Sequence, residues 1–195
     1  MSDASLPSDI RGLLDELDTA ERDASAVVNG LSEQLGTRRP QPAAWSVAEC
    51  IDHLATANRV YLASMQEPAR RARQAGKTRR GRARPGLIGG LFVYTLEPPP
   101  KWWARMPAPE KIRPSPSPPL AQSFAAFITS QDDVRAFLRE YANLDLSGVR
   151  FPNPFIPGLR FSLATGLNVI TAHERRHLAQ AWSVRRVVEN AGDMT

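Results

Sequence analysis

Apolar residues recur every three or four positions over four long stretches of the chain, the spacing that places them on one face of an α-helix. The predicted helices cover about residues 8–35, 46–74, 120–142 and 162–190. Helices of this length with little strand-like alternation favour an all-α fold, specifically a four-helix bundle. We expect residues 1–195 to form a single domain.

The second predicted helix has the clearest start signal. Ser46 and Glu49 lie three residues apart, the spacing of a capping box, and Trp45 and Cys50 occupy the two positions of a hydrophobic staple. We therefore predict that this helix begins at Ser46. Cys50 is expected to be a small buried core residue rather than a metal ligand or a reactive thiol.

The pattern breaks down over residues 76–119. Nine of the 17 prolines lie between Pro98 and Pro119, and proline has no amide hydrogen to donate to a helix or a central strand. We predict a long connection between the second and third helices. Its apolar parts, residues 87–96 and 102–103, are expected to pack against the helices, because leaving them in water is unfavourable.

The net charge of +5 comes from one basic segment. Eight of the 25 basic residues lie between Arg70 and Arg84, and no acidic residue occurs between Glu67 and Glu97. This segment is able to bind nucleic-acid phosphates or anionic lipid, and Lys101 with its two neighbouring tryptophans to lie at a membrane interface. No nucleic-acid-binding motif accompanies it, so we favour a solvated helix end and loop. Folded over a substrate site, its arginines would attract an anionic substrate.

The sequence gives no sign of a membrane-spanning segment or a secretory signal. Its longest apolar run, residues 87–96, is shorter than the roughly 18 residues needed to span a bilayer. Residues 1–4 begin no secretory signal, and the single cysteine, Cys50, excludes an internal disulfide. We expect a cytoplasmic location.

The three histidines, His53, His173 and His177, are the most informative residues of the sequence. His173 and His177 lie four residues apart in a predicted helix, so their imidazoles project from the same face. If the second and fourth helices pack together, His53 joins them around one ion and leaves positions for water or substrate, as in catalytic zinc sites. Two histidines four residues apart on a helix often bind no metal without a third ligand, so this prediction depends on His53.

A second motif overlaps this site. His173, Glu174 and His177 match the His-Glu-x-x-His pattern of zinc peptidases, in which the glutamate polarises the metal-bound water. The longer forms of the motif are absent, and Glu189 lies too far along the helix to complete a site, so a zincin-like metallopeptidase is the less favoured alternative. Glu174 is our candidate catalytic residue, as a base or by orienting a ligand histidine, although it is equally able to face water. The capping box already accounts for Glu49, the other carboxylate considered.

Together these residues resemble the DinB-like superfamily of metal-binding helical proteins, which includes the YfiT-type proteins. The matching features are Trp45-Ser46 at a helix start, His53-Leu54, and residues 173–180. The resemblance covers most of the chain and implies an up-down-down-up four-helix bundle. It also implies a divalent metal held by the three histidines, for which zinc and nickel are suitable. Some relatives are transferases or isomerases that use small thiols such as bacillithiol or mycothiol, and relatives suggest a homodimer.

These observations predict a metal-binding protein acting on a small-molecule substrate, as a thiol transferase, an isomerase or a hydrolase. The mechanism would be Lewis-acid activation of a bound water or thiolate. The alternative is a non-catalytic dimeric bundle whose basic insertion, Arg70 to Pro119, contacts a polyanion or a protein partner. The sequence leaves open whether the protein is an enzyme, and nucleic acid is not an expected partner.

Overall fold

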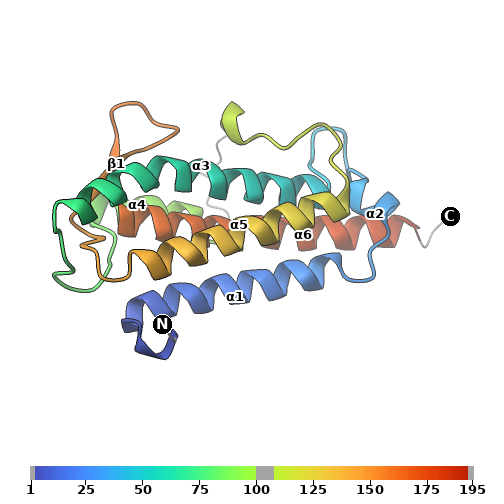
Figure 1. Ribbon diagram of the computed structural model, residues 1–195. Helices are drawn as coiled ribbons and strands as arrows, with labels where there is room; N and C mark the ends of the chain where they lie inside the picture. Colours follow the sequence, from blue (N-terminus) through green and yellow to red (C-terminus); the bar gives the residue numbers. More distant parts are fainter. Residues whose placement is uncertain (1–2, 100–107, 193–195) are drawn as a thin grey trace.

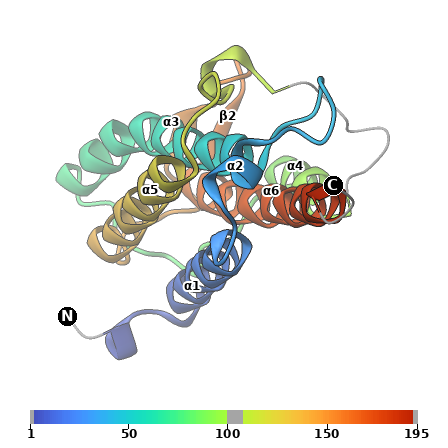
Figure 2. The ribbon, with the colours of Figure 1, turned by 90° about the vertical axis from the view of Figure 1, so that its right-hand side faces the viewer.

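A computed structural model describes residues 3–99 and 108–192, and it is mostly helical. Four long helices run lengthwise beside one another (Figure 1). Helix α3 packs against both α5 and α6, and α1 packs against the same two helices from the other side (Figure 2). The all-α prediction is confirmed in this broad form. The bounds of these helices are Ser8–Val28 for α1, Val47–Gln74 for α3, Leu120–Glu140 for α5 and Leu163–Gly192 for α6.

The core consists of two apolar clusters with a polar layer between them. One cluster joins the first halves of α1 and α6 to the second halves of α3 and α5, and the other joins the remaining halves. The residues between the clusters include buried polar side chains from three helices: His53, Asn58, Ser130, Gln131 and Glu174. Burying polar groups is costly unless they find partners, so this middle layer is where function is expected.

The start of α3 has the predicted capping box. The Ser46 hydroxyl accepts a hydrogen bond from the amide of Glu49 at 3.2 Å, and the Glu49 carboxylate accepts one from the amide of Ser46 at 2.8 Å. Arg39 forms an ion pair with the same carboxylate. These contacts fix the helix end from which His53 projects two turns later.

The prediction of one continuous helix over residues 8–35 was wrong. Helix α1 ends at Val28, and a short helix α2 (Glu33–Thr37) follows. Gly30 has a φ of +72°, which a helix does not contain, and Ser32 caps α2 by accepting from the amide of Leu35. The apolar spacing continues across this break, so periodicity alone did not reveal it.

The connection between α3 and α5 is more ordered than the sequence suggested. It contains a ten-residue helix, α4 (Leu87–Leu96), and a short 3-10 helix, η3 (Glu110–Ile112). Helix α4 fits between Pro85 and Pro98 and packs against α6, outside the four long helices (Figure 2). The sequence predicted that this segment packs against the long helices, but it did not predict that the segment is helical. Residues 102–103 lie outside the described residues.

A short hairpin that the sequence did not indicate precedes α6. Strands β1 (Arg150–Pro152) and β2 (Arg160–Ser162) pair antiparallel through Phe151 and Phe161. The hairpin holds the loop of residues 153–159 beside α3 and α6. Within residues 3–99 and 108–192, no helix combines the length and the apolar character needed to cross a membrane.

Candidate metal centre

The structure brings the three histidines together, as the sequence predicted. His53 projects from α3, and His173 and His177 project from successive turns of α6. The ring centroids lie 4.4 Å apart for His53 and His177, 4.5 Å for His173 and His177, and 4.8 Å for His53 and His173. One nitrogen of each ring lies within 4.8 Å of the others. Residues separated by 120 positions therefore meet at one point.

The spacing of the ring nitrogens fits a shared ion. The Nε2 atoms of His53 and His173 are 3.1 Å apart. Two nitrogens bound tetrahedrally to zinc at about 2.0–2.1 Å lie about 3.3 Å from each other. For this pair a small adjustment of the rings is enough to reach that distance, and the remaining ligand atoms lie within 4.8 Å of one another.

Two of the three imidazoles are oriented by hydrogen bonds on their far side. The Nδ1 atom of His53 lies 2.5 Å from the carbonyl oxygen of Ile112, and the Nδ1 atom of His177 lies 2.9 Å from the Gln180 side-chain oxygen. An oxygen acceptor requires that Nδ1 carry the proton, which leaves a lone pair on Nε2. Both Nε2 atoms are then available as ligands, the arrangement typical of metal-binding histidines.

Neither orienting group was predicted from the sequence. The Ile112 carbonyl is a backbone atom of η3, 59 residues after His53, and has no side-chain signature. Gln180 lies three residues after His177 on the same helix, a spacing at which helical side chains are neighbours. That spacing was the signal that would have identified it.

Burial keeps the imidazoles neutral. Desolvation lowers the pKa of His53, and desolvation together with the neighbouring histidines lowers the pKa of His173 well below its usual value. The pKa of His177 falls to about 3 for the same reasons. Neutral imidazole is the form that binds metals, so protons do not compete at neutral pH.

Trp45 lies beside the histidine group, whereas Cys50 belongs to the apolar core. The ring of Trp45 lies 4.8 Å from that of His53 and 5.8 Å from that of His177. Cys50 is fully buried in the apolar core, and burial raises the pKa of its thiol. It does not belong to the histidine group, which confirms that it is a core residue.

The three histidines line a cavity of about 1000 Å³. Most of its other lining residues are apolar and come from α3, α4, α6, the segment before α3 and the hairpin loop; they include Trp45, Tyr61, Phe92, Leu96, Phe155, Ile156 and Val169. Arg176 is the one charged residue among the described lining residues, and it donates to the carbonyl of Thr95 at 3.1 Å. The arginines of residues 70–84 do not line the cavity. The insertion instead forms part of its wall.

Glu174 faces a different direction from its neighbour His173. Successive helical residues are about 100° apart, and Glu174 is fully buried and does not line the cavity. One of its carboxylate oxygens accepts from the amide of Asn58 at 2.8 Å, and Asn58 also donates to Ser130 at 3.2 Å. Burial raises the pKa of Glu174 to about 7. Its catalytic role stays a prediction, and these contacts favour a structural one.

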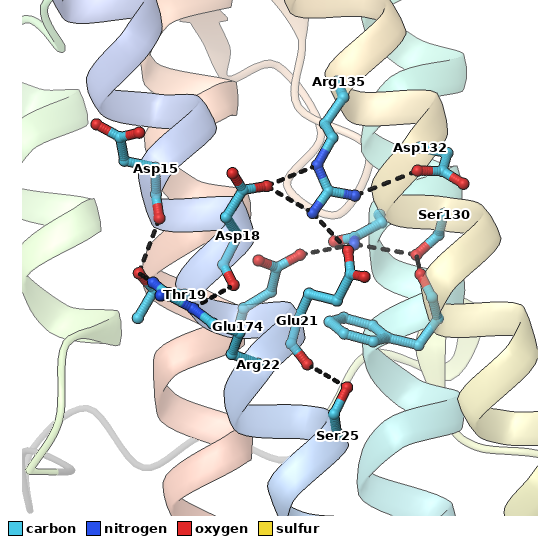
Figure 3. Close-up of polar contacts among 12 residues, drawn as sticks. Asp15, Asp18, Thr19, Glu21, Arg22, Ser25, Ser130, Asp132, Arg135 and Glu174 are labelled. Carbon is cyan, nitrogen blue, oxygen red and sulfur yellow. Dashed lines mark hydrogen bonds and ion pairs between the residues drawn. The ribbon is translucent and has the colours of Figure 1, made fainter.

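The surroundings of Glu174 also bear on the peptidase motif. Figure 3 shows Glu174 beside the network in which Arg135 pairs with Asp18 at 2.9 Å and with Glu21 at 2.5 Å. A peptidase glutamate must lie within hydrogen-bond reach of the group that it deprotonates. A carboxylate enclosed among these helices does not meet that requirement, so the geometry gives the zincin-like alternative no support.

Comparison with known proteins gives one match, to a protein family whose model covers the residues of the candidate metal site. No curated protein and no solved structure matches the chain. The family model of the DinB superfamily matches residues 16–181, a range that includes the capping box of α3 and all three histidines. Because this match spans most of the sequence, the chain belongs to the DinB superfamily.

Proposed function

We propose that the protein binds one divalent transition-metal ion through His53, His173 and His177 and acts with it on a small molecule held in the cavity. The observation that carries this proposal is the convergence of three neutral imidazoles at the wall of a large apolar cavity. Three protein ligands leave further coordination positions free, as in catalytic rather than structural sites.

Zinc or nickel, when bound, supplies Lewis acidity that lowers the pKa of a water or thiol ligand. The protein's own groups prepare the site for this chemistry. Ile112 and Gln180 hold two of the imidazoles with Nε2 toward the common point. The apolar wall limits access of water, which strengthens electrostatic interactions, and Arg176 attracts an anionic group of the substrate.

The reaction that we propose is a thiol transfer or isomerisation with a small cellular thiol as cosubstrate, or a hydrolysis. Glu174 contributes by fixing α6 against α3 rather than by touching substrate. We further propose an up-down-down-up connectivity, supported by the way the two core clusters pair the halves of the four long helices. Homodimerisation is proposed from the resemblance alone.

The first experiment is elemental analysis of protein purified without a histidine tag. We expect one equivalent of zinc or nickel in the wild type and none in the double variant His173→Ala/His177→Ala. Stoichiometric metal in that variant would rule out the site.

The second experiment is an activity screen of the metal-loaded protein with and without small thiols. We expect thiol-transfer, isomerase or hydrolase activity that a chelator abolishes and that His53→Ala lacks. Metal binding without any such activity would favour the non-catalytic alternative.

A further inference from the structure

Helix α4 exposes an apolar face to solvent. The described residues expose six large apolar side chains, and four of them lie on this one helix: Leu87 at 96%, Ile88 at 73%, Leu91 at 62% and Tyr94 at 53%. Their spacing places them on one side of α4. The opposite side, with Phe92, packs against the body. A contiguous exposed apolar patch of this kind marks an interaction surface.

Unpaired cations lie directly before this helix. Lys77, Arg80, Arg82 and Arg84 are exposed, and none forms an ion pair with a carboxylate of the described residues. The other basic residues of the segment do form such pairs: Arg70, Arg71, Arg73 and Arg79. Within the basic segment, the cations without an ion pair therefore all lie in residues 77–84, which lead into α4.

The backbone that carries these cations is fixed to the body of the protein. The amide of Arg79 donates to the Asn143 carbonyl at 2.8 Å, and the amide of Arg84 donates to the Ser147 hydroxyl at 2.9 Å. Between them, the amide of Ala83 donates to a carboxylate of α1 at 2.6 Å. The basic segment and the apolar face thus keep a fixed relation to each other, and little order has to be gained on binding.

We propose that residues 77–84 and the outer face of α4 form a docking surface for an anionic lipid bilayer. The apolar side chains enter the boundary between headgroups and acyl chains, and the cations contact the lipid phosphates and carboxylates. Nucleic acid offers phosphates but nothing that takes up Leu87, Ile88 and Leu91 together. A symmetric contact between two copies brings the same basic segment of each copy to one interface, and like charges oppose it.

This surface is distinct from the metal centre. The outer face of α4 meets the lipid, and the inner face supplies Phe92 and Leu96 to the cavity wall. Docking therefore does not require that the three histidines bind an ion. The two proposals fail separately, because vesicle binding and metal content are independent measurements.

The test is co-sedimentation of the full chain with vesicles of phosphatidylcholine alone and with vesicles in which about one third of the lipid is phosphatidylserine. We expect binding to the anionic vesicles at low salt, with the bound fraction falling as salt rises. Each basic residue at such a surface contributes about a fivefold factor in affinity, so Arg80→Gln/Arg84→Gln is expected to bind at least tenfold more weakly. Arg59→Gln, at an exposed arginine of α3, is the matched control.

The apolar half of the surface is tested by Leu87→Ser/Leu91→Ser, with Val187→Ser on α6 as the control. All three positions are exposed, so helicity and melting temperature should not change. We expect at least a tenfold weaker vesicle binding for the α4 variant only. Equal binding to neutral and anionic vesicles, wild-type binding by either double variant, or no binding at low salt would overturn the proposal. Loss of a dimer in the α4 variant, with no vesicle binding by the wild type, would assign the face to self-association.

Discussion

Two adjacent residues of α6 belong to polar clusters with opposite properties. His173 faces the cavity, and Glu174 faces the closed interior between α1, α3 and α5. Both clusters lie in the polar layer between the two apolar cores, and in both burial shifts the pKa toward the neutral form. The difference lies in whether the atoms that the hydrogen bonds leave free open to the cavity.

On the histidine side, the hydrogen bonds to Ile112 and Gln180 engage the far ring nitrogens and leave the near ones free. On the Glu174 side, the hydrogen bond from Asn58 engages one carboxylate oxygen, and the other oxygen, Oε2, is buried without a hydrogen-bond partner among the described residues and does not reach the cavity. A ligand site therefore needs polar atoms that are oriented but unengaged and open to a cavity. Burial and residue type alone do not identify such a site.

The sharpest test of this comparison is metal affinity. His173→Ala removes a ligand, and we expect the zinc dissociation constant to rise more than a hundredfold, beyond the range of changes to outer groups. Glu174→Gln keeps the shape and the contact with Asn58, so its affinity should stay within about threefold of the wild type. Competition with a chelator of known affinity measures both. A comparable loss in the two variants would mean that Glu174 belongs to the site.

Stability should respond in the opposite way. Glu174→Ala leaves a void and removes one of the two hydrogen-bond acceptors of the Asn58 amide, and we expect it to lower the free energy of unfolding by about 2–4 kcal/mol. His177→Ala, at the wall of an existing cavity, should cost less than half of that. Urea unfolding of the metal-free proteins measures both values. The reverse order would show that the histidine cluster holds the helices together.

The two clusters should also give opposite pH dependences in the metal-free protein. The pKa of Glu174 is about 7 when folded against 4.5, so the unfolded chain loses its proton first. Stability therefore falls between about pH 4.5 and pH 7, by at most about 3 kcal/mol. The folded pKa of His177 is about 3 against 6.5, so the unfolded chain gains its proton first. The stability that the protein gains by keeping His177 neutral is therefore lost as the pH falls below 6.5.

Glu174→Gln separates the two contributions. Glutamine cannot ionise, so the decrease in stability on raising the pH should disappear and the decrease on acidification should remain. Urea unfolding at a series of pH values between 4 and 8 provides the measurement. If the wild type and Glu174→Gln keep the same pH profile over that range, Glu174 does not titrate in the folded protein.

The sequence predicted the parts of this site that depend on local geometry. Helical spacing placed His173 and His177 on one face, and the capping box fixed where α3 begins. The meeting with His53 required that α3 and α6 pack together, which the periodicity made plausible and the resemblance supported. The same rotation of about 100° per residue that places the two histidines on one face turns Glu174 away from His173, so the direction of Glu174 was also readable from the sequence.

Other features had no local signal. The break at Gly30 left the apolar spacing intact, so the first helix was predicted too long. The prolines of the insertion concealed α4, which forms in the gap between them. The carbonyl of Ile112 acts on His53 through a backbone atom that any residue supplies, so no pattern of side chains predicts its position.

The smallest predicted effect tests how much the orientation of the His177 ring contributes to metal affinity. Gln180→Ala removes the hydrogen bond to Nδ1 of His177, and loss of such an orienting group weakens metal binding by about tenfold to a hundredfold. That hydrogen bond raises the pKa of His177, so its loss keeps the imidazole neutral, and weaker binding then reflects orientation rather than protonation. Ser183→Ala is the matched control, because Ser183 also lines the cavity but donates to the carbonyl of Ala179. Chelator competition at two pH values above 7 distinguishes the variants, and equal affinities for Gln180→Ala and Ser183→Ala would show that α6 alone orients His177.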